Sequence, residues 1–89
     1  MKLIVFTKKA KKDLKKLQHT PKKVKMLSDV LYKLANDVAL DECYHVHQLK
    51  GEYQGCLECH IQGDFLLIWI EDDHIKVLRV GSHSELFGK

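Results

Sequence analysis

The sequence predicts a single α+β domain over residues 1–89, with elements in the order β-α-α-β-β-β. Three observations predict this class. An apolar run precedes a lysine-rich segment with helical spacing, the period of the apolar residues becomes extended after Asp41, and three short apolar runs follow. We therefore expect a helical hairpin on one face of a small, mainly antiparallel sheet.

The chain begins with a predicted strand and a predicted helix. Residues 2–6 form a short run rich in branched apolar residues, which is typical of a strand. Thr7 can then cap a helix that reaches about Gln18. Small and apolar side chains lie on one side of this helix and lysines lie elsewhere. The apolar side comprises Ala10, Leu14 and Leu17.

A second helix has a clearer start. Thr20 is in the N-cap position and Pro21 takes the first helical position, where its missing N–H costs nothing. Its apolar residues alternate in steps of three and four, which lays one face onto a neighbouring surface. This stripe comprises Val24, Leu27, Leu31, Leu34 and Val38.

Three strands are predicted in the second half of the chain, over about 56–61, 65–70 and 75–80. The middle run, FLLIWI, is apolar on both faces, so it should be the central strand. Short, turn-prone connections favour an antiparallel meander. The final SHSELF segment is expected to form a short turn, and the face of the sheet without helices would remain free for a site.

The net charge of +3 conceals two unlike segments. Residues 1–25 hold ten lysines and one acid, a net charge of +9, whereas the remaining residues carry −6. A surface of one sign attracts nucleic acid without reading bases, although a solvated helix face or a site for an acidic protein remains an alternative. The candidate RNA- or ribosome-binding residues are Lys8, Lys9, Lys11, Lys12, Lys15, Lys16, Lys22 and Lys23.

Composition excludes several classes of protein. A hydrophobic fraction of 45% excludes a disordered chain. The longest apolar run has six residues, far below the roughly 18 that a membrane span needs. The first residues do not have the order of a signal peptide, so we expect a cytoplasmic protein whose three cysteines need not pair.

The sequence Cys56-x-x-Cys59-His60 matches the attachment motif of c-type haem, and a zinc site with His45 or His47 is an alternative. Strand geometry opposes both, because residues three apart point to opposite faces. Cys59 is then expected in the core with Leu57 and Ile61, and Cys56 is expected to be a small surface residue. By the same parity, Glu58 and His60 should line the face without helices.

Arg79 and His83 stand out near the C-terminus. Arg79 is the only arginine, against fourteen lysines, and precedes the GSHSELF segment that contains His83. A planar guanidinium is suited to holding a phosphate, and a structural salt bridge is the competing interpretation. Histidine can both take and give protons near neutral pH.

Three ordered motifs cover roughly half of the chain: His47-x-Leu49-x-Gly51, the segment from Glu58 to Trp69, and the segment from Arg79 to Phe87. In residue types and spacing they resemble the YafQ branch of the RelE-type bacterial toxins. The resemblance implies a RelE-like fold and an mRNA interferase that cleaves mRNA in the ribosomal A site. It also implies a cognate antitoxin, encoded adjacently, and no metal or other cofactor.

The active-site residues implied by the resemblance are His47, His60, Asp64 and His83, supported by Arg79 and Phe87. Two positions depart from the family pattern. Phe65 replaces a frequent tryptophan, and Leu57 replaces a frequent basic residue, so part of the phosphate clamp is missing or supplied by lysines.

The expected chemistry is acid–base cleavage of RNA. Asp64, His47 or His60 would activate the 2′-OH, His83 would protonate the leaving oxygen, and Arg79 would stabilise the phosphate, while Phe87 would pack on a base. One alternative is a non-catalytic toxin of the same fold that resembles the ParE-like inhibitors of gyrase, which lack a matching histidine set. Another is a simple RNA-binding module.

Overall fold

In this computed structural model, which describes residues 1–88, the predicted α+β class is confirmed, and the six predicted elements occur in the predicted order together with an additional short strand and a C-terminal helix. The helices and strands are β1 (Leu3–Phe6), α1 (Lys8–Leu17), α2 (Pro21–Ala35), β2 (His47–Gln48), β3 (Leu57–Gln62), β4 (Phe65–Glu71), β5 (His74–Ser82) and α3 (His83–Phe87). Two 3-10 turns, η1 (Glu42–Tyr44) and η2 (Gly51–Tyr53), flank β2. Sequence analysis did not predict β2, because a strand of two residues has no periodicity to detect.

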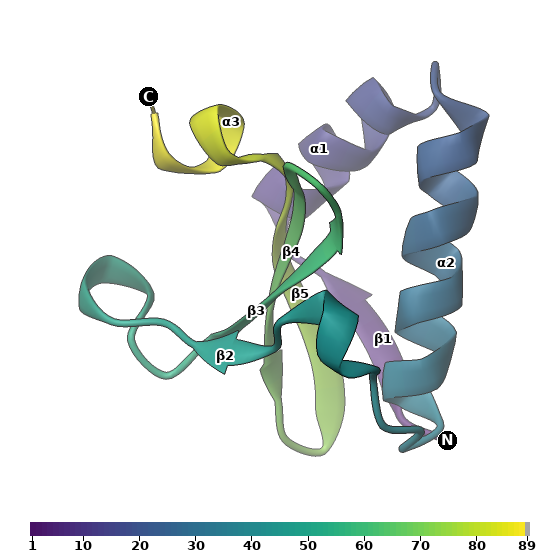
Figure 1. The fold of residues 1–89 in the computed structure, drawn as a ribbon, viewed down its shortest axis with the longest axis vertical. Coiled ribbons are helices and arrows are strands. Elements are labelled where there is room, and N and C mark those ends of the chain that lie inside the picture. The colour runs from purple at the N-terminus through teal and green to yellow at the C-terminus, as the bar shows by residue number, and fades with distance from the viewer. Residues whose placement is uncertain (89) are drawn as a thin grey trace.

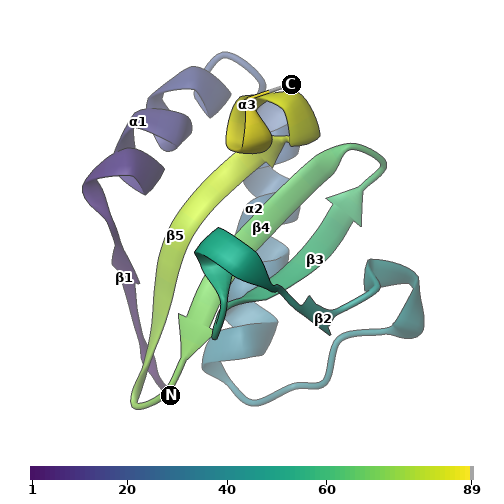
Figure 2. The ribbon, with the colours of Figure 1, turned by 90° about the vertical axis from the view of Figure 1, so that its left-hand side faces the viewer.

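The five strands of the described residues form one mixed sheet (Figure 1), and Figure 2 shows them side by side in the order β1-β5-β4-β3-β2. The antiparallel meander of β3, β4 and β5 and the central position of β4 are confirmed. β1 pairs with β5 in parallel. A parallel pair needs a crossover connection, and the chain between β1 and the meander begins with the helical hairpin.

The helical hairpin packs on one face of the sheet, as Figure 2 shows with α2 behind the strands. The local signals agree with this arrangement: the Thr7 side chain accepts a hydrogen bond from the Ala10 N–H at 3.1 Å and caps α1, and Pro21 begins α2. The main hydrophobic core lies between the helices and the sheet. Its largest fully buried side chains are Trp69, Leu67, Ile75, Val30 and Val77.

The extent of the α2 stripe differs from the prediction. α2 ends at Ala35, and Asp37 adopts a left-handed backbone conformation, so Val38 lies outside the helix with 48% of its surface exposed. Val24 is also exposed, whereas Val30, which the stripe did not include, is 1% exposed. Leu27, Leu31 and Leu34 of the predicted stripe are buried, so the three-four spacing is correct from Leu27 to Leu34.

The parity argument for β3 is confirmed. Leu57, Cys59 and Ile61 contact the helix-side core, and Glu58 points to the other face. The expectation that Cys56 is a surface residue was wrong. It is 4% exposed and belongs to a second, smaller cluster on the helix-free face. This second cluster is completed by Leu66, Ile68 and Leu86.

The final segment forms the helix α3 rather than a turn. Ser82 and Glu85 form a capping box, in which the Ser82 hydroxyl accepts from the Glu85 N–H and the Glu85 carboxylate accepts from the Ser82 N–H. Gly88 ends the helix in a left-handed conformation. α3 therefore covers part of the face that sequence analysis left open. Within residues 1–88, no helix is long and apolar enough to cross a membrane.

Candidate active site

Four of the predicted site residues form two groups. His47 on β2 and His60 on β3 form one group, with ring centroids 6.1 Å apart. Asp64 and His83 form the other, because the turn between β3 and β4 meets the start of α3. Arg79 is separate from both groups and faces α1.

The first group is organised around Glu58. His47 and Glu58 face each other in the β2–β3 pair, and the distance from His47 Nε2 to Glu58 Oε1 is 3.0 Å. The other ring nitrogen, His47 Nδ1, lies 2.7 Å from the carbonyl oxygen of His45. The His60 ring packs edge-on against the His45 ring at 5.7 Å. Three histidines and a carboxylate therefore meet at the rim of the sheet.

The second group links the β3–β4 turn to α3. Asp64 Oδ1 accepts a hydrogen bond from the backbone N–H of His83 at 2.9 Å, which anchors the first residue of α3. The His83 ring lies 4.8 Å from the Phe87 ring, one helical turn later. Tyr53 from η2 packs edge-on against Phe87 at 5.9 Å. This arrangement exposes an imidazole beside two aromatic rings.

Arg79 is held by a buried acid. Its Nε donates to Asp13 Oδ2 at 2.8 Å and its Nη2 donates to Asp13 Oδ1 at 3.2 Å. Asp13 also accepts from the Val80 N–H at 3.1 Å and is 6% exposed. The hydrogen bond with Asp13 raises the pKa of the Arg79 guanidinium above its ordinary value. The competing interpretation of Arg79 as a structural ion-pair residue is therefore supported by two hydrogen bonds.

Arg79 nevertheless borders an open pocket of about 380 Å³. Tyr53 contributes to the lining, and Lys8 and Lys9 extend it from the start of α1. The guanidinium is thus fixed in position at the edge of a cationic, aromatic hollow that adjoins the Tyr53–Phe87 contact.

The eight candidate lysines are all exposed, on α1 and on the first turn of α2. At the hairpin tip, the positive surface approaches α3. Lys16 Nζ lies 3.9 Å from the Glu85 carboxylate, and Lys23 Nζ lies 5.5 Å from the centre of the Phe65 ring. The basic surface therefore continues towards the element that carries His83.

The cysteines do not converge. Burial, followed by the charge of Glu58, raises the pKa of the Cys59 thiol to about 12, and burial raises the pKa of Cys56. Cys59 and Cys56 belong to clusters on opposite faces, as strand parity requires. Within residues 1–88, no three histidine, cysteine, aspartate or glutamate side chains are placed to hold a metal ion.

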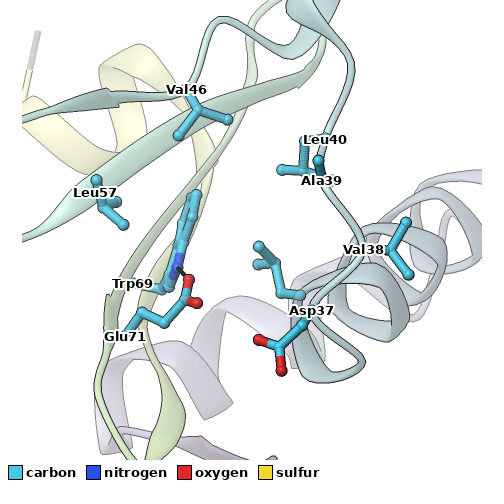
Figure 3. A pocket seen from close by; sticks show the side chains of 9 residues that line it. Asp37, Val38, Ala39, Leu40, Val46, Leu57, Trp69 and Glu71 are labelled. Carbon is cyan, nitrogen blue, oxygen red and sulfur yellow. Dashed lines mark hydrogen bonds between the residues drawn. The ribbon is translucent and has the colours of Figure 1, made fainter.

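A separate pocket of about 340 Å³ lies between the end of α2 and the sheet (Figure 3). Apolar side chains such as Leu40 and Val46 line it, and the Trp69 indole N–H donates to Glu71 at 3.3 Å. None of the predicted site residues belongs to its lining. His47 and His83 are exposed, which suits a polymeric substrate better than a small enclosed one.

Sequence analysis missed three contributors. Glu58 was placed on the correct face but was not included among the site residues, although strand parity beside His60 was a usable signal. Asp13 was counted only as the single acid among the lysines. Tyr53 carried no signal, because its position beside Phe87 depends on the η2 turn.

Solved structures of bacterial toxins share this fold. A metal-bound toxin from Helicobacter pylori superimposes with a TM-score of 0.88 at 38% identity, over 98% of this chain and 100% of that chain. The Escherichia coli DinJ-YafQ toxin–antitoxin complex contains a chain that superimposes with a TM-score of 0.85 at 29% identity, over 98% of both chains. The fold thus defines a bacterial toxin of the RelE-like class.

Sequence comparison identifies the family. The family described as "Bacterial toxin of type II toxin-antitoxin system, YafQ" matches residues 2–88. The mRNA interferase toxin YafQ of Escherichia coli K12 is 32% identical over 79 residues, which cover 86% of each chain. The chain belongs to the YafQ family of type II toxin–antitoxin toxins, which confirms the resemblance drawn from the three motifs.

Proposed function

We propose that this protein is an endoribonuclease that cleaves mRNA on the ribosome and so inhibits translation. The proposal is supported by two contacts between predicted site residues: the His47 ring lies beside the His60 ring, and Asp64 holds the backbone N–H of His83. The family membership and the name of the Escherichia coli relative, an mRNA interferase, support it.

The proposed reaction is metal-independent acid–base chemistry. A base among His47, His60 and Asp64 removes the proton of a 2′-OH, and the resulting oxygen attacks the adjacent phosphorus. The bond to the 5′-oxygen breaks, and that oxygen takes a proton from the imidazolium of His83. Arg79 and nearby lysines stabilise the charge on the phosphate, and Phe87 packs on a base. The products are a 2′,3′-cyclic phosphate and a 5′-hydroxyl.

Purified toxin mixed with ribosomes that carry a defined mRNA tests the proposal, with naked mRNA and EDTA as further arms. We expect ribosome-dependent cleavage that persists in EDTA, and a loss of about 10²–10⁴-fold for His83→Ala. The EDTA arm is needed because one relative is a metal-bound toxin. Products with a 3′-hydroxyl and a 5′-phosphate would contradict the mechanism. In cells that express the toxin, growth arrest with intact mRNA would favour the ParE-like alternative.

The lysines of α1 and α2 are proposed to bind ribosomal RNA phosphates without reading sequence. Replacing Lys8, Lys9, Lys11 and Lys12 with Gln should weaken ribosome binding and flatten its dependence on salt. Chemistry on saturated ribosomes should change less. If the affinity of the unmodified protein for ribosomes did not change with salt concentration, these lysines would be only a solvated helix face.

A cognate antitoxin is the proposed protein partner. The solved Escherichia coli relative is in a complex with DinJ, a toxin–antitoxin pair. Co-expression of this chain with the product of a small adjacent open reading frame should yield a stable complex and abolish growth arrest. Because the proposed substrate is mRNA on the ribosome, we also propose a cytoplasmic location.

A further inference from the structure

We infer that Glu58 is a positioning residue that keeps a ring nitrogen of His47 in a hydrogen bond. His47 is then not the general base, and His60 takes that role. This inference rests on the proposed function and narrows the choice among its three candidate bases. It is carried by the hydrogen-bonding geometry of the His47 ring.

Both ring nitrogens of His47 face oxygen atoms. The carbonyl oxygen of His45, 2.7 Å from Nδ1, can only accept, so Nδ1 must carry a proton. Nε2 lies 3.0 Å from a carboxyl oxygen of Glu58, and a proton must lie between these two atoms. It belongs either to the imidazole or to the acid. In both cases neither nitrogen has a free lone pair, and a base needs one.

The surroundings of Glu58 favour this contact. Its side chain is 7% exposed, and its second oxygen, Oε2, is buried without a hydrogen-bond partner among residues 1–88. A buried carboxyl group without a partner is costly, so its contact with His47 is the interaction that offsets the cost. The register of β2 against β3 places the two residues opposite each other, which brings the His47 ring within reach of the Glu58 carboxyl group.

The remaining candidates are not equivalent. Asp64 uses Oδ1 to hold the N–H of His83 and so positions the start of α3 and its imidazole. His60 is held by ring contacts with His45 and His47, and such contacts use no nitrogen lone pair. His60 is therefore the candidate base whose ring nitrogens are used by none of these contacts, and we assign it the 2′-OH proton, while both ring nitrogens of His47 stay hydrogen-bonded to His45 and Glu58.

Nuclear magnetic resonance of the free protein tests the ring geometry without any RNA. In protein labelled with ¹⁵N at histidine, both ring nitrogens of His47 should give hydrogen-bonded signals. Glu58→Gln should change the Nε2 signal and leave the His83 signals unchanged. Glu42→Gln, at an exposed glutamate of η1, is the matched control. An unprotonated His47 nitrogen with no hydrogen bond would overturn the inference even if the toxin proves fully active.

Cleavage kinetics test the division of roles. Glu58→Gln should lower single-turnover cleavage by about 10–100-fold, as for carboxylates that orient functional histidines. The double variant with His47→Gln should be no slower than the slower single variant, because Glu58 acts through His47. Additive losses would show that Glu58 acts independently of His47.

A substrate with sulfur at the bridging 5′ position separates base from acid, because a thiolate leaves without a proton. On this RNA, His83→Ala should recover most of its activity and His60→Ala should stay impaired by about 10²–10⁴-fold. A larger deficit for His47→Gln than for His60→Ala would overturn the assignment. Absence of cleavage by the unmodified protein on normal mRNA would instead refute the proposed function and leave the resonance result standing.

Discussion

The two faces of the sheet are held by different kinds of interaction. The face towards α1 and α2 is packed with apolar side chains, including Leu67 and Trp69 in the central strand. The opposite face has a small cluster beneath α3 and a rim of polar groups joined by specific contacts. One face is stabilised mainly by burial of apolar surface, and the other is positioned by hydrogen bonds.

This difference separates stability from chemistry. Contacts of the helix-side core involve no candidate catalytic group, so the sheet can present histidines without using them for packing. As a consequence, the positions of the candidate site residues depend on β2 and α3, two short elements with few buried neighbours. Substitutions on the helix-side face should therefore mainly lower the free energy of unfolding, whereas substitutions on the opposite face should mainly lower cleavage.

The largest expected effect on stability is that of Leu67→Ala in the helix-side core. Leu67 is fully buried in the central strand, and truncation of a buried leucine costs about 2–5 kcal/mol in the free energy of unfolding. Leu66→Ala is the matched substitution on the other face, where the thinner cover can relax. Its cost should lie near the lower end of that range. Equal losses in urea denaturation would contradict the distinction between the faces.

The next effect concerns Asp13, the buried acid that joins α1 to β5. Asp13→Asn retains the shape but weakens three hydrogen bonds, two of them from Arg79. The free energy of unfolding should fall by about 1–3 kcal/mol, because a buried charged group loses its partner. Cleavage should fall as well if Arg79 must be fixed beside its pocket.

Asp29→Asn is the control for this prediction. Asp29 forms an exposed pair with Lys25 on α2, and such a change should alter stability by about 0.5 kcal/mol or less. A stability loss without any change in cleavage would assign Arg79 to the scaffold alone and remove it from the catalytic group.

Much of the helix-side face was predictable from periodicity. Strand parity placed Leu57, Cys59 and Ile61 towards the helices, because alternation is a local property of the sequence. The limits of the α2 stripe were not predictable in this way, since α2 ends at Ala35 and leaves Val38 outside the helix, and Val24 near its start is exposed.

The candidate site was predictable as a set of residues but not as a geometry. The family motifs named His47 and His83, yet the contacts that position them come from other parts of the chain. Arg79 meets Asp13 across 66 positions, and Glu58 meets His47 only because a two-residue strand pairs with β3. No local sequence pattern encodes such long-range pairings, so the ion pair of Arg79 with Asp13 was visible only in the folded structure. The same is true of the burial of Cys56.

The smallest effect is expected at the capping box that holds α3 on the site face. Hydrogen bonding from the Ser82 N–H lowers the pKa of the Glu85 carboxyl below its ordinary value. A lowered pKa in the folded state means that the ionised carboxylate contributes stability above the pKa of the unfolded chain. That contribution is lost as the pH falls through the folded-state value.

Glu85→Gln should therefore lower the free energy of unfolding by about 0.3–1 kcal/mol at pH 7 and by less in acid. Hydrogen exchange at the backbone amides of α3 offers a local measurement, since fraying of this helix frees the N–H of Glu85 and loosens His83. Protection of β4 amides should not change, because the helix-side core does not include α3. If the stability difference between Glu85→Gln and the unmodified protein instead grew on acidification, the sign of the linkage would be reversed. Glu85 would then stabilise α3 without its charge. If β4 lost protection together with α3, the two faces of the sheet would unfold as one unit. The site face would then not open independently of the helix-side core.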